Sequence, residues 1–261
     1  MNTDTHQRLY KARCHNWTAM TRDLLTLGGK VIAAFAIAFG THAVAQGVEV
    51  TGRIEVMHQR SNAHATTATS ANVVVWLTPL SKGQPVPEPH KSQEFTLAQK
   101  DKQFVPHILV VPTGSSVNFP NLDPFFHNVF SLFNGKRFDL GLYEGNTRHV
   151  VQFDREGVSY IFCNIHPEMG AVVVSLSTPF YALSTAQGNL TLHGVPPGTY
   201  RLNVWAENVS VERLNELSLV VEISSQSAQL GTLHLVASGD VMNHHPNKFG
   251  ENYSPEPKGS Y

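Results

Sequence analysis

The chain has 261 residues, of which 41% are hydrophobic and 15% charged, so it can build a packed core and is not disordered throughout. Its formal net charge is -1 and no Lys/Arg cluster occurs, which excludes the basic surface expected of a nucleic-acid-binding protein. This length suffices for one large or two small domains.

The first 45 residues have the features of a secretory signal peptide. Basic residues precede an apolar run at 31–40, which is about half of the ~20 residues needed to cross a bilayer. Ala43-Val44-Ala45 then gives an A-x-A cleavage sequence, so cleavage after Ala45 is expected. The mature chain would be periplasmic and have no membrane span. An uncleaved anchor is the alternative, and Met20 is an alternative start of better proportions.

Cleavage after Ala45 would also change the number of cysteines. Cleavage removes Cys14 and leaves Cys163 as the single cysteine of the mature chain. No disulfide can then form within that chain. A lone thiol in an oxidising compartment is expected to be buried or bonded to a partner such as a metal.

From residue 46 onward, short runs rich in Val, Ile, Phe and Tyr alternate with Gly, Pro, Asn and Asp, which is typical of a β-sandwich or barrel. Val117 and Phe119 should share one face of their strand, as should Ile161 and Cys163. The expected strands are 48–57, 72–78, 107–111, 116–119, 149–153, 158–163 and 171–176.

A second series of predicted strands begins after Thr178. Four more strands, at 189–193, 199–205, 217–223 and 229–236, would form a second, smaller β-sandwich. After Ser238 apolar residues become scarce, and a disordered tail is expected.

One segment carries most of the chemistry, Phe162-Cys163-Asn164-Ile165-His166-Pro167-Glu168-Met169. It brings a thiolate, an imidazole and a thioether together on one loop, and His127 adds a second imidazole from upstream. Two imidazoles and a thiolate in one plane, with a weak axial Met, define a blue-copper site. The predicted ligands of one type 1 copper ion are therefore His127, Cys163, His166 and Met169. Glu168 or a backbone oxygen is the alternative axial donor.

These residues resemble the cupredoxin family, and the Cys163–His166–Met169 spacing, with Pro167, is similar to the loop of amicyanins. The segments 114–123 and 134–144 also resemble bacterial plastocyanin-like proteins of the methylamine-utilisation group. The resemblance covers about residues 95–177 and implies a Greek-key β-sandwich. It further implies that Asn128 ties the two ligand loops together and so orients the ligands from outside the coordination sphere.

The region 178–238 is similar to carboxypeptidase-regulatory-like or transthyretin-like modules, through Gly188 and Val195-Pro-Pro-Gly-Thr-Tyr-Arg-Leu. A small amicyanin has no such module, so a role in methylamine oxidation is not implied. The expected fold class is all-β, a cupredoxin Greek-key β-sandwich followed by a second, smaller β-sandwich. The expected division is a signal peptide at 1–45, a copper domain at 46–177, the second sandwich at 178–238 and a disordered tail at 239–261.

A site of this kind implies that single electrons pass between redox partners, such as a cytochrome or a dehydrogenase, without enzymatic turnover. Copper sequestration or delivery is one alternative, and an envelope-binding module with a structural copper site is another. Hydrolysis by Cys163 as nucleophile is disfavoured because no oxyanion-hole motif is present. Multicopper oxidase chemistry is disfavoured because the sequence has no His-x-His pair.

The roles of several other side chains stay open at this stage. His107 is either a hydrogen-bonded strand histidine or a residue that takes part in the site as ligand or electron relay. Phe125, Phe126 and Phe162 either belong to the core or form an apolar docking surface beside the copper loop.

Overall fold

The computed structural model describes residues 47–58, 66–67, 69–81, 87, 94–132, 135–237 and 246–253. The expected signal peptide, its cleavage after Ala45 and the alternative start at Met20 lie outside these residues. In the part of the chain that the structure describes, no helix combines the length and the apolar character needed to cross a membrane.

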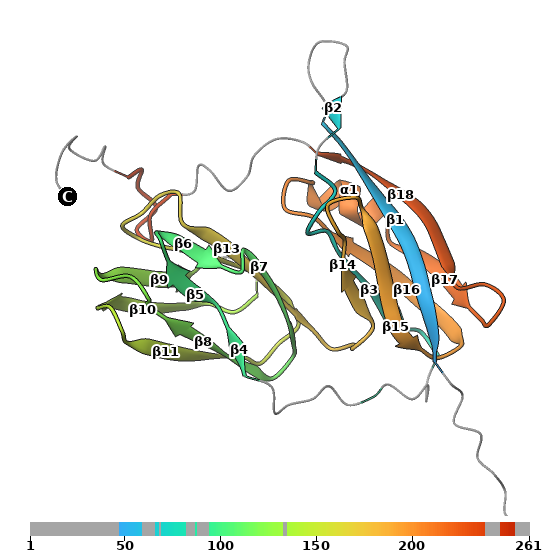
Figure 1. The fold of residues 1–261 in the computed structure, drawn as a ribbon, viewed down its shortest axis with the longest axis horizontal. Helices are drawn as coiled ribbons and strands as arrows, with labels where there is room; N and C mark the ends of the chain where they lie inside the picture. Colours follow the sequence, from blue (N-terminus) through green and yellow to red (C-terminus); the bar gives the residue numbers. More distant parts are fainter. Residues whose placement is uncertain are drawn as a thin grey trace, which may run out of the picture. The chain divides into compact units, whose positions relative to one another are not determined.

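The strands between residues 94 and 176 form two sheets that enclose a common core (Figure 1). The larger sheet has the order β10-β9-β12-β13-β7, with β7 (Ile108–Pro112), β9 (His127–Ser131), β10 (Phe138–Tyr143), β12 (Gly157–Phe162) and β13 (Gly170–Leu176). The smaller sheet has the order β11-β8-β4, with β4 (Phe95–Thr96), β8 (Ser115–Pro120) and β11 (Arg148–Phe153). A hairpin of β5 (Ala98–Lys100) and β6 (Gln103–Val105) precedes β7.

The core between these two sheets takes alternate residues of the strands. Val117 and Phe119 of β8 both belong to it, as do Ile161 of β12 and the adjoining Cys163. The predicted shared faces are therefore confirmed. They matter for the site, because the alternation that buries Ile161 also turns the Cys163 side chain inward.

The remaining strands form two further sheets. One has the order β15-β1-β18 with β2 beside β1, and the other has the order β14-β3-β16-β17 (Figure 1). Their strands are β1 (Val48–His58), β2 (Thr66–Thr67), β3 (Val74–Pro79), β14 (Tyr181–Leu183), β15 (Asn189–Val195), β16 (Gly198–Trp205), β17 (Leu219–Ile223) and β18 (Gln229–Ala237). A short helix, α1 (Val211–Glu216), begins after Ser210, whose side chain accepts a hydrogen bond from the Arg213 amide.

These sheets divide the chain differently from the expected boundary at residue 177. β1 and β3 fall within the range expected for the copper domain, yet β1 pairs with β15 and β18, and β3 pairs with β14 and β16. The second group of sheets thus contains strands from both ends of the described chain. Alternation within a strand shows which face is buried, but it does not specify the neighbouring strand, so the sequence pattern of β1 could not reveal this pairing.

The described part of the predicted tail also departs from expectation. Residues 246–253 make hydrogen bonds to Cys163 and Asn164, which are described below. Residues 239–245 and 254–261 lie outside the described ranges.

Candidate metal centre

The four predicted ligands meet at one end of the larger sheet. His127 is the first residue of β9, and Cys163 directly follows β12, which is the neighbour of β9. His166 and Met169 lie in the short turn between Cys163 and β13. The residues His127, Cys163 and Met169 are fully buried, and His166 is 6% exposed.

The three strong donors have the spacing that a metal ion needs. Sγ of Cys163 lies 3.8 Å from Nδ1 of His127 and 3.5 Å from Nδ1 of His166. All three ligand atoms lie within 4.8 Å of one another. Bonds of about 2.0 Å to imidazole and about 2.3 Å to thiolate, as zinc makes, place nitrogen and sulfur about 3.7 Å apart in a trigonal plane. The sulfur–nitrogen separations of 3.5 and 3.8 Å match this arrangement.

Backbone hydrogen bonds hold the loop 163–169 in a tight turn. The Cys163 amide donates to the carbonyl of Met169 at 3.2 Å, and the Met169 amide donates to the carbonyl of His166 at 3.0 Å. Met169 is buried in the same core as Cys163, whereas Glu168 is exposed. This difference favours Met169 over Glu168 as the axial donor.

The environment of the Cys163 thiol sets a condition for metal binding. Burial raises the pKa of this thiol, while the backbone amides of Asn128, Ile165 and His166 act in the opposite direction by donating to the sulfur. A metal must therefore displace the thiol proton when it binds. The three amides then remain as donors to the thiolate.

Asp123 is a site residue to which the sequence analysis gave no role. Its Oδ2 lies 2.8 Å from Nε2 of His127, and its side chain is 6% exposed. Burial opposes ionisation of Asp123, but hydrogen bonds from His127 and from the amides of Lys102 and Asp101 outweigh it and hold the pKa of this carboxyl below its usual range. The ionised carboxylate accepts the Nε2 proton of His127 and leaves Nδ1 free to bind a metal.

The β5–β6 hairpin holds Asp123 in place. The turn residues Asp101 and Lys102 both have positive φ, 54° and 56°, and their amides donate to the Asp123 carboxylate at 2.7 and 3.0 Å. Gly145 lies against Asp123 from another direction, and a Cβ at Gly145 would approach the Asp123 carbonyl oxygen to 2.3 Å. The position of Asp123 is therefore fixed by backbone contacts on two sides.

Asn128 contacts the site through its backbone, as the amide that donates to Cys163. Its side-chain amide donates to Oδ1 of Asp139 on β10 at 2.8 Å. The same carboxylate accepts a hydrogen bond from Nζ of Lys248 at 2.7 Å, and the backbone amide of Lys248 donates to the Asn164 side chain at 2.9 Å. Asn128 is thus linked to the loop 163–169 through Asp139 and Lys248.

The sequence left the roles of His107, Phe125, Phe126 and Phe162 undecided, and the structure places these residues in different environments. His107 lies outside the ligand group: Nδ1 is 3.0 Å from the carbonyl oxygen of Gly170, and Nε2 is 2.8 Å from the carboxylate of Glu207. Phe162 is buried in the core, whereas Phe126 is 54% exposed. Phe125 is half-buried and contacts the rings of both predicted histidine ligands, at centroid distances of 5.2 and 5.9 Å.

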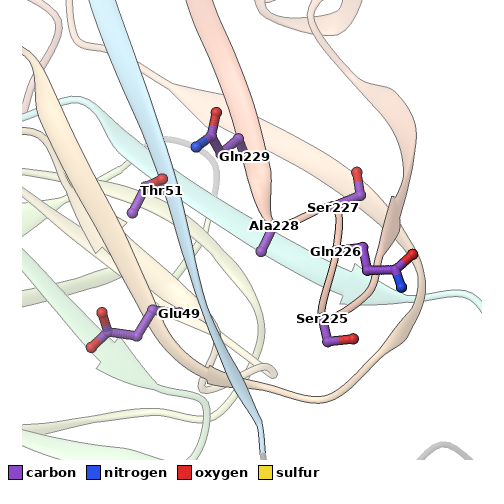
Figure 2. A pocket seen from close by; sticks show the side chains of 7 residues that line it. All are labelled: Glu49, Thr51, Ser225, Gln226, Ser227, Ala228 and Gln229. Carbon is purple, nitrogen blue, oxygen red and sulfur yellow. The ribbon is translucent and has the colours of Figure 1, made fainter.

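A separate pocket of about 500 Å³ lies away from these residues, and Figure 2 shows the side chains around it. It is formed by Glu49 and Thr51 of β1 and by the turn between β17 and β18. The lining side chains include one carboxylate and no histidine or cysteine. The His127-Cys163-His166 group is therefore the stronger candidate for a metal site.

A two-sheet β-structure that buries a His-Cys-His group with a buried Met beside it has the donor set of a type 1 copper site. The soft thiolate and the two imidazoles suit copper, and the spacing of the donors fits a trigonal plane.

Comparison with known proteins gives distant structural likenesses. No protein-family model matches the chain, and no curated protein sequence does so either. A purple cupredoxin from Nitrosopumilus maritimus is 24% identical over 31% of this chain and 99% of its own, with a TM-score of 0.29. A variant of amicyanin with Cu(I) is 17% identical over 35% of this chain and 97% of its own, with a TM-score of 0.31.

A copper-containing nitrite reductase from Thermus scotoductus is 23% identical, with a TM-score of 0.31. That match covers 38% of this chain but spans only 25% of the reductase. Each of these three matches covers about a third of this chain.

Proposed function

We propose that this chain is a type 1 copper protein that passes single electrons between redox partners. One observation carries the proposal: the buried donor atoms of His127, Cys163 and His166 lie within 4.8 Å of one another, with the buried Met169 on the same loop. Copper held by these residues would supply a one-electron Cu(I)/Cu(II) couple.

The surroundings of the ligands favour electron transfer over other copper chemistry. His127 is fixed by Asp123, and the loop 163–169 is closed by its own backbone hydrogen bonds. Ligands held in this way move little when the charge of the bound ion changes, so the barrier to gaining or losing an electron stays low. This rigidity is the basis for proposing an electron carrier and not an enzyme.

A redox protein, such as a cytochrome or a dehydrogenase, is the proposed partner. Exposed apolar side chains lie on the segments that carry or adjoin the ligands: Leu122 is 55% exposed, Phe126 54%, Leu142 63% and Ile165 39%. Exposed apolar side chains of this kind suit brief docking by an apolar partner face. Export to the periplasm, proposed from the sequence of residues 1–45, would place the site among periplasmic redox proteins.

Reconstitution with Cu(II) tests the proposal. The wild-type protein should show strong absorption toward the red end of the visible spectrum, bleached by ascorbate, and an EPR signal of a copper–thiolate site. Cys163→Ser should abolish both, because the thiolate is lost. His193→Ala is the matched control, since this exposed histidine pairs with Glu49 outside the ligand group. A copper-loaded wild-type protein without the colour would contradict the proposal.

Electron exchange with a cytochrome separates carriage from storage. A carrier should oxidise a reduced cytochrome within seconds of mixing in a stopped-flow experiment. A blue protein that binds copper tightly yet exchanges no electrons would support sequestration or delivery instead.

A further inference from the structure

Residues 246–253, here called the C-terminal clasp, bond directly to the ligand loop. The hydroxyl of Tyr253 donates to the carbonyl of Cys163 at 2.8 Å. The backbone amide of Lys248 donates to Oδ1 of Asn164, the next residue along, at 2.9 Å. The clasp therefore contacts two consecutive residues of the loop 163–169, one of which is the predicted thiolate ligand.

The clasp has a defined internal structure. Oδ1 of Asn247 accepts the amides of Phe249 and Glu251, each at 2.9 Å. The Asn247 amide donates in turn to the carbonyl of Glu251 at 2.8 Å, and Gly250 has a φ of +81°, which a glycine adopts without strain. This turn arranges Lys248 and Tyr253 before either reaches the loop.

The Lys248 side chain connects the clasp to the other ligand-bearing strand. Its Nζ lies 2.7 Å from Oδ2 of Asp139, and the second oxygen of that carboxylate accepts the side-chain amide of Asn128. Asn128 follows His127 on β9, and its own backbone amide donates to the Cys163 sulfur. Hydrogen bonds thus join Asn128 to Asp139, Asp139 to the Lys248 side chain, and the Lys248 backbone amide to Asn164.

We propose that Lys248 and Tyr253 are positioning residues of the metal centre, and that the clasp holds the loop 163–169 against β9. The inference rests on the proposed copper site, but its physical content, the order of the loop, does not need copper. Tyr253 fixes the Cys163 carbonyl, and Lys248 joins the loop to the strand that carries His127. Without the clasp, Cys163 and His166 would keep their sequence spacing but lose their fixed distance from His127.

Hydrogen exchange in the metal-free protein is the first test. Tyr253→Phe and Lys248→Met should each speed exchange of the Cys163 and Met169 amides about five- to tenfold, the factor expected when one hydrogen bond of ordinary strength no longer opposes local opening. Amides of β11 should not change. Tyr181→Phe, which removes a hydroxyl from a tyrosine on β14, is the matched control and should leave the loop unaffected.

Copper-loaded protein gives the second readout. Each clasp variant should shift the copper–thiolate absorption or the EPR hyperfine splitting and release copper to a chelator several-fold faster than the wild type. Removal of residues 239–261 should change the spectrum and the rate of copper release more than either point variant does. Removal of residues 254–261 alone should not have this larger effect. If the truncated chain does not fold, the two point variants decide.

The two proposals fail in different ways. A wild-type protein that takes up no copper would remove the proposed function, while the exchange of the loop amides would still decide the role of the clasp. The proposed role of the clasp would be overturned if amide exchange in the loop and copper release both stay unchanged in Tyr253→Phe and Lys248→Met. The longer truncation, if it folds, should then also leave both unchanged.

Discussion

Nε2 of His127 and Oδ2 of Asp123 lie 2.8 Å apart, and both side chains are shielded from solvent. Because Asp123 is held as a carboxylate by two backbone amides, it can act only as an acceptor, and the imidazole must carry its proton on Nε2. Nδ1 then keeps its lone pair on the side that faces Cys163. A carboxylate in this position fixes the tautomer, orients the ring and makes the free nitrogen a stronger donor.

Asp123→Asn should weaken copper binding about 10- to 100-fold, the usual cost of losing a carboxylate that supports a metal-bound histidine. An amide offers both an NH₂ donor and an oxygen acceptor, so it no longer selects one tautomer of His127. Competition with a chelator of known affinity measures the change. Asp154→Asn is the control, since that carboxylate is 48% exposed and pairs with Lys136 away from the site. Equal affinities of the wild-type protein and Asp123→Asn would show that the contact does not support the ligand.

Three of the four proposed copper donors could be chosen from the sequence because their identity and spacing are local properties. Cys163, His166 and Met169 lie on one loop, and a thiolate, an imidazole and a thioether at that spacing have few other uses. The structure brings His127 to them, because β9 and β12 are neighbours in the sheet. Most long strands were also predicted, because a run rich in Val, Ile, Phe and Tyr between turn residues is visible in each strand alone.

The sequence could not show what depends on contacts between distant segments. Asp123 lies four residues before His127 and reads as part of a turn until its carboxylate is seen against the ring. Lys248 and Tyr253 lie in a stretch with few apolar residues, which favoured a disordered tail, because hydrogen bonds to Asn164 and Cys163 leave no pattern in the sequence. β9 was missed because its five residues include His, Asn and Ser, although all five are buried.

Met169→Leu distinguishes an axial donor from a core residue. Leucine fills nearly the same volume, so the free energy of unfolding should change by less than about 1.5 kcal/mol. If the thioether is the axial donor, its loss should raise the reduction potential and alter the visible spectrum, because the axial ligand tunes both. Cyclic voltammetry measures the potential. Met57→Leu, on β1 and 39% exposed, should change neither property. An unchanged potential in Met169→Leu would leave Met169 as a core residue only.

The pair of His107 and Glu207 should make stability depend on pH. The hydrogen bond that Nε2 of His107 donates to the Glu207 carboxylate is the main cause that raises the pKa of His107, and burial opposes it without cancelling it. A histidine whose pKa is higher in the folded state stabilises the fold fully below its unfolded pKa of about 6.5, and this contribution is lost as pH rises through the folded value. Since His107 is 44% exposed, solvent screening keeps the effect below about 1 kcal/mol.

Urea unfolding of the wild type and Glu207→Gln at pH 6 and pH 9 measures this effect. The wild type should be the more stable protein at pH 6, and the difference should shrink at pH 9, where His107 is neutral in both. Glu49→Gln serves as the control, because Glu49 and its partner His193 are 69% and 73% exposed and contribute little. A difference that is the same at both pH values would mean that the charge on His107 is not its source.

Phe126→Ser tests the exposed apolar residues as a docking surface. Phe126 is 54% exposed and follows Phe125, which contacts both histidine rings, so a partner docked there would approach the site closely. Loss of the aromatic side chain should slow electron exchange with a cytochrome about five- to tenfold, as truncation of an interface aromatic commonly does. The copper spectrum should stay the same, because the Phe126 side chain is exposed and the ring of the adjacent His127 is held by Asp123. Val220→Ser on β17, a residue that is 64% exposed, provides the comparison. Equal rates in the two variants would place the docking surface elsewhere.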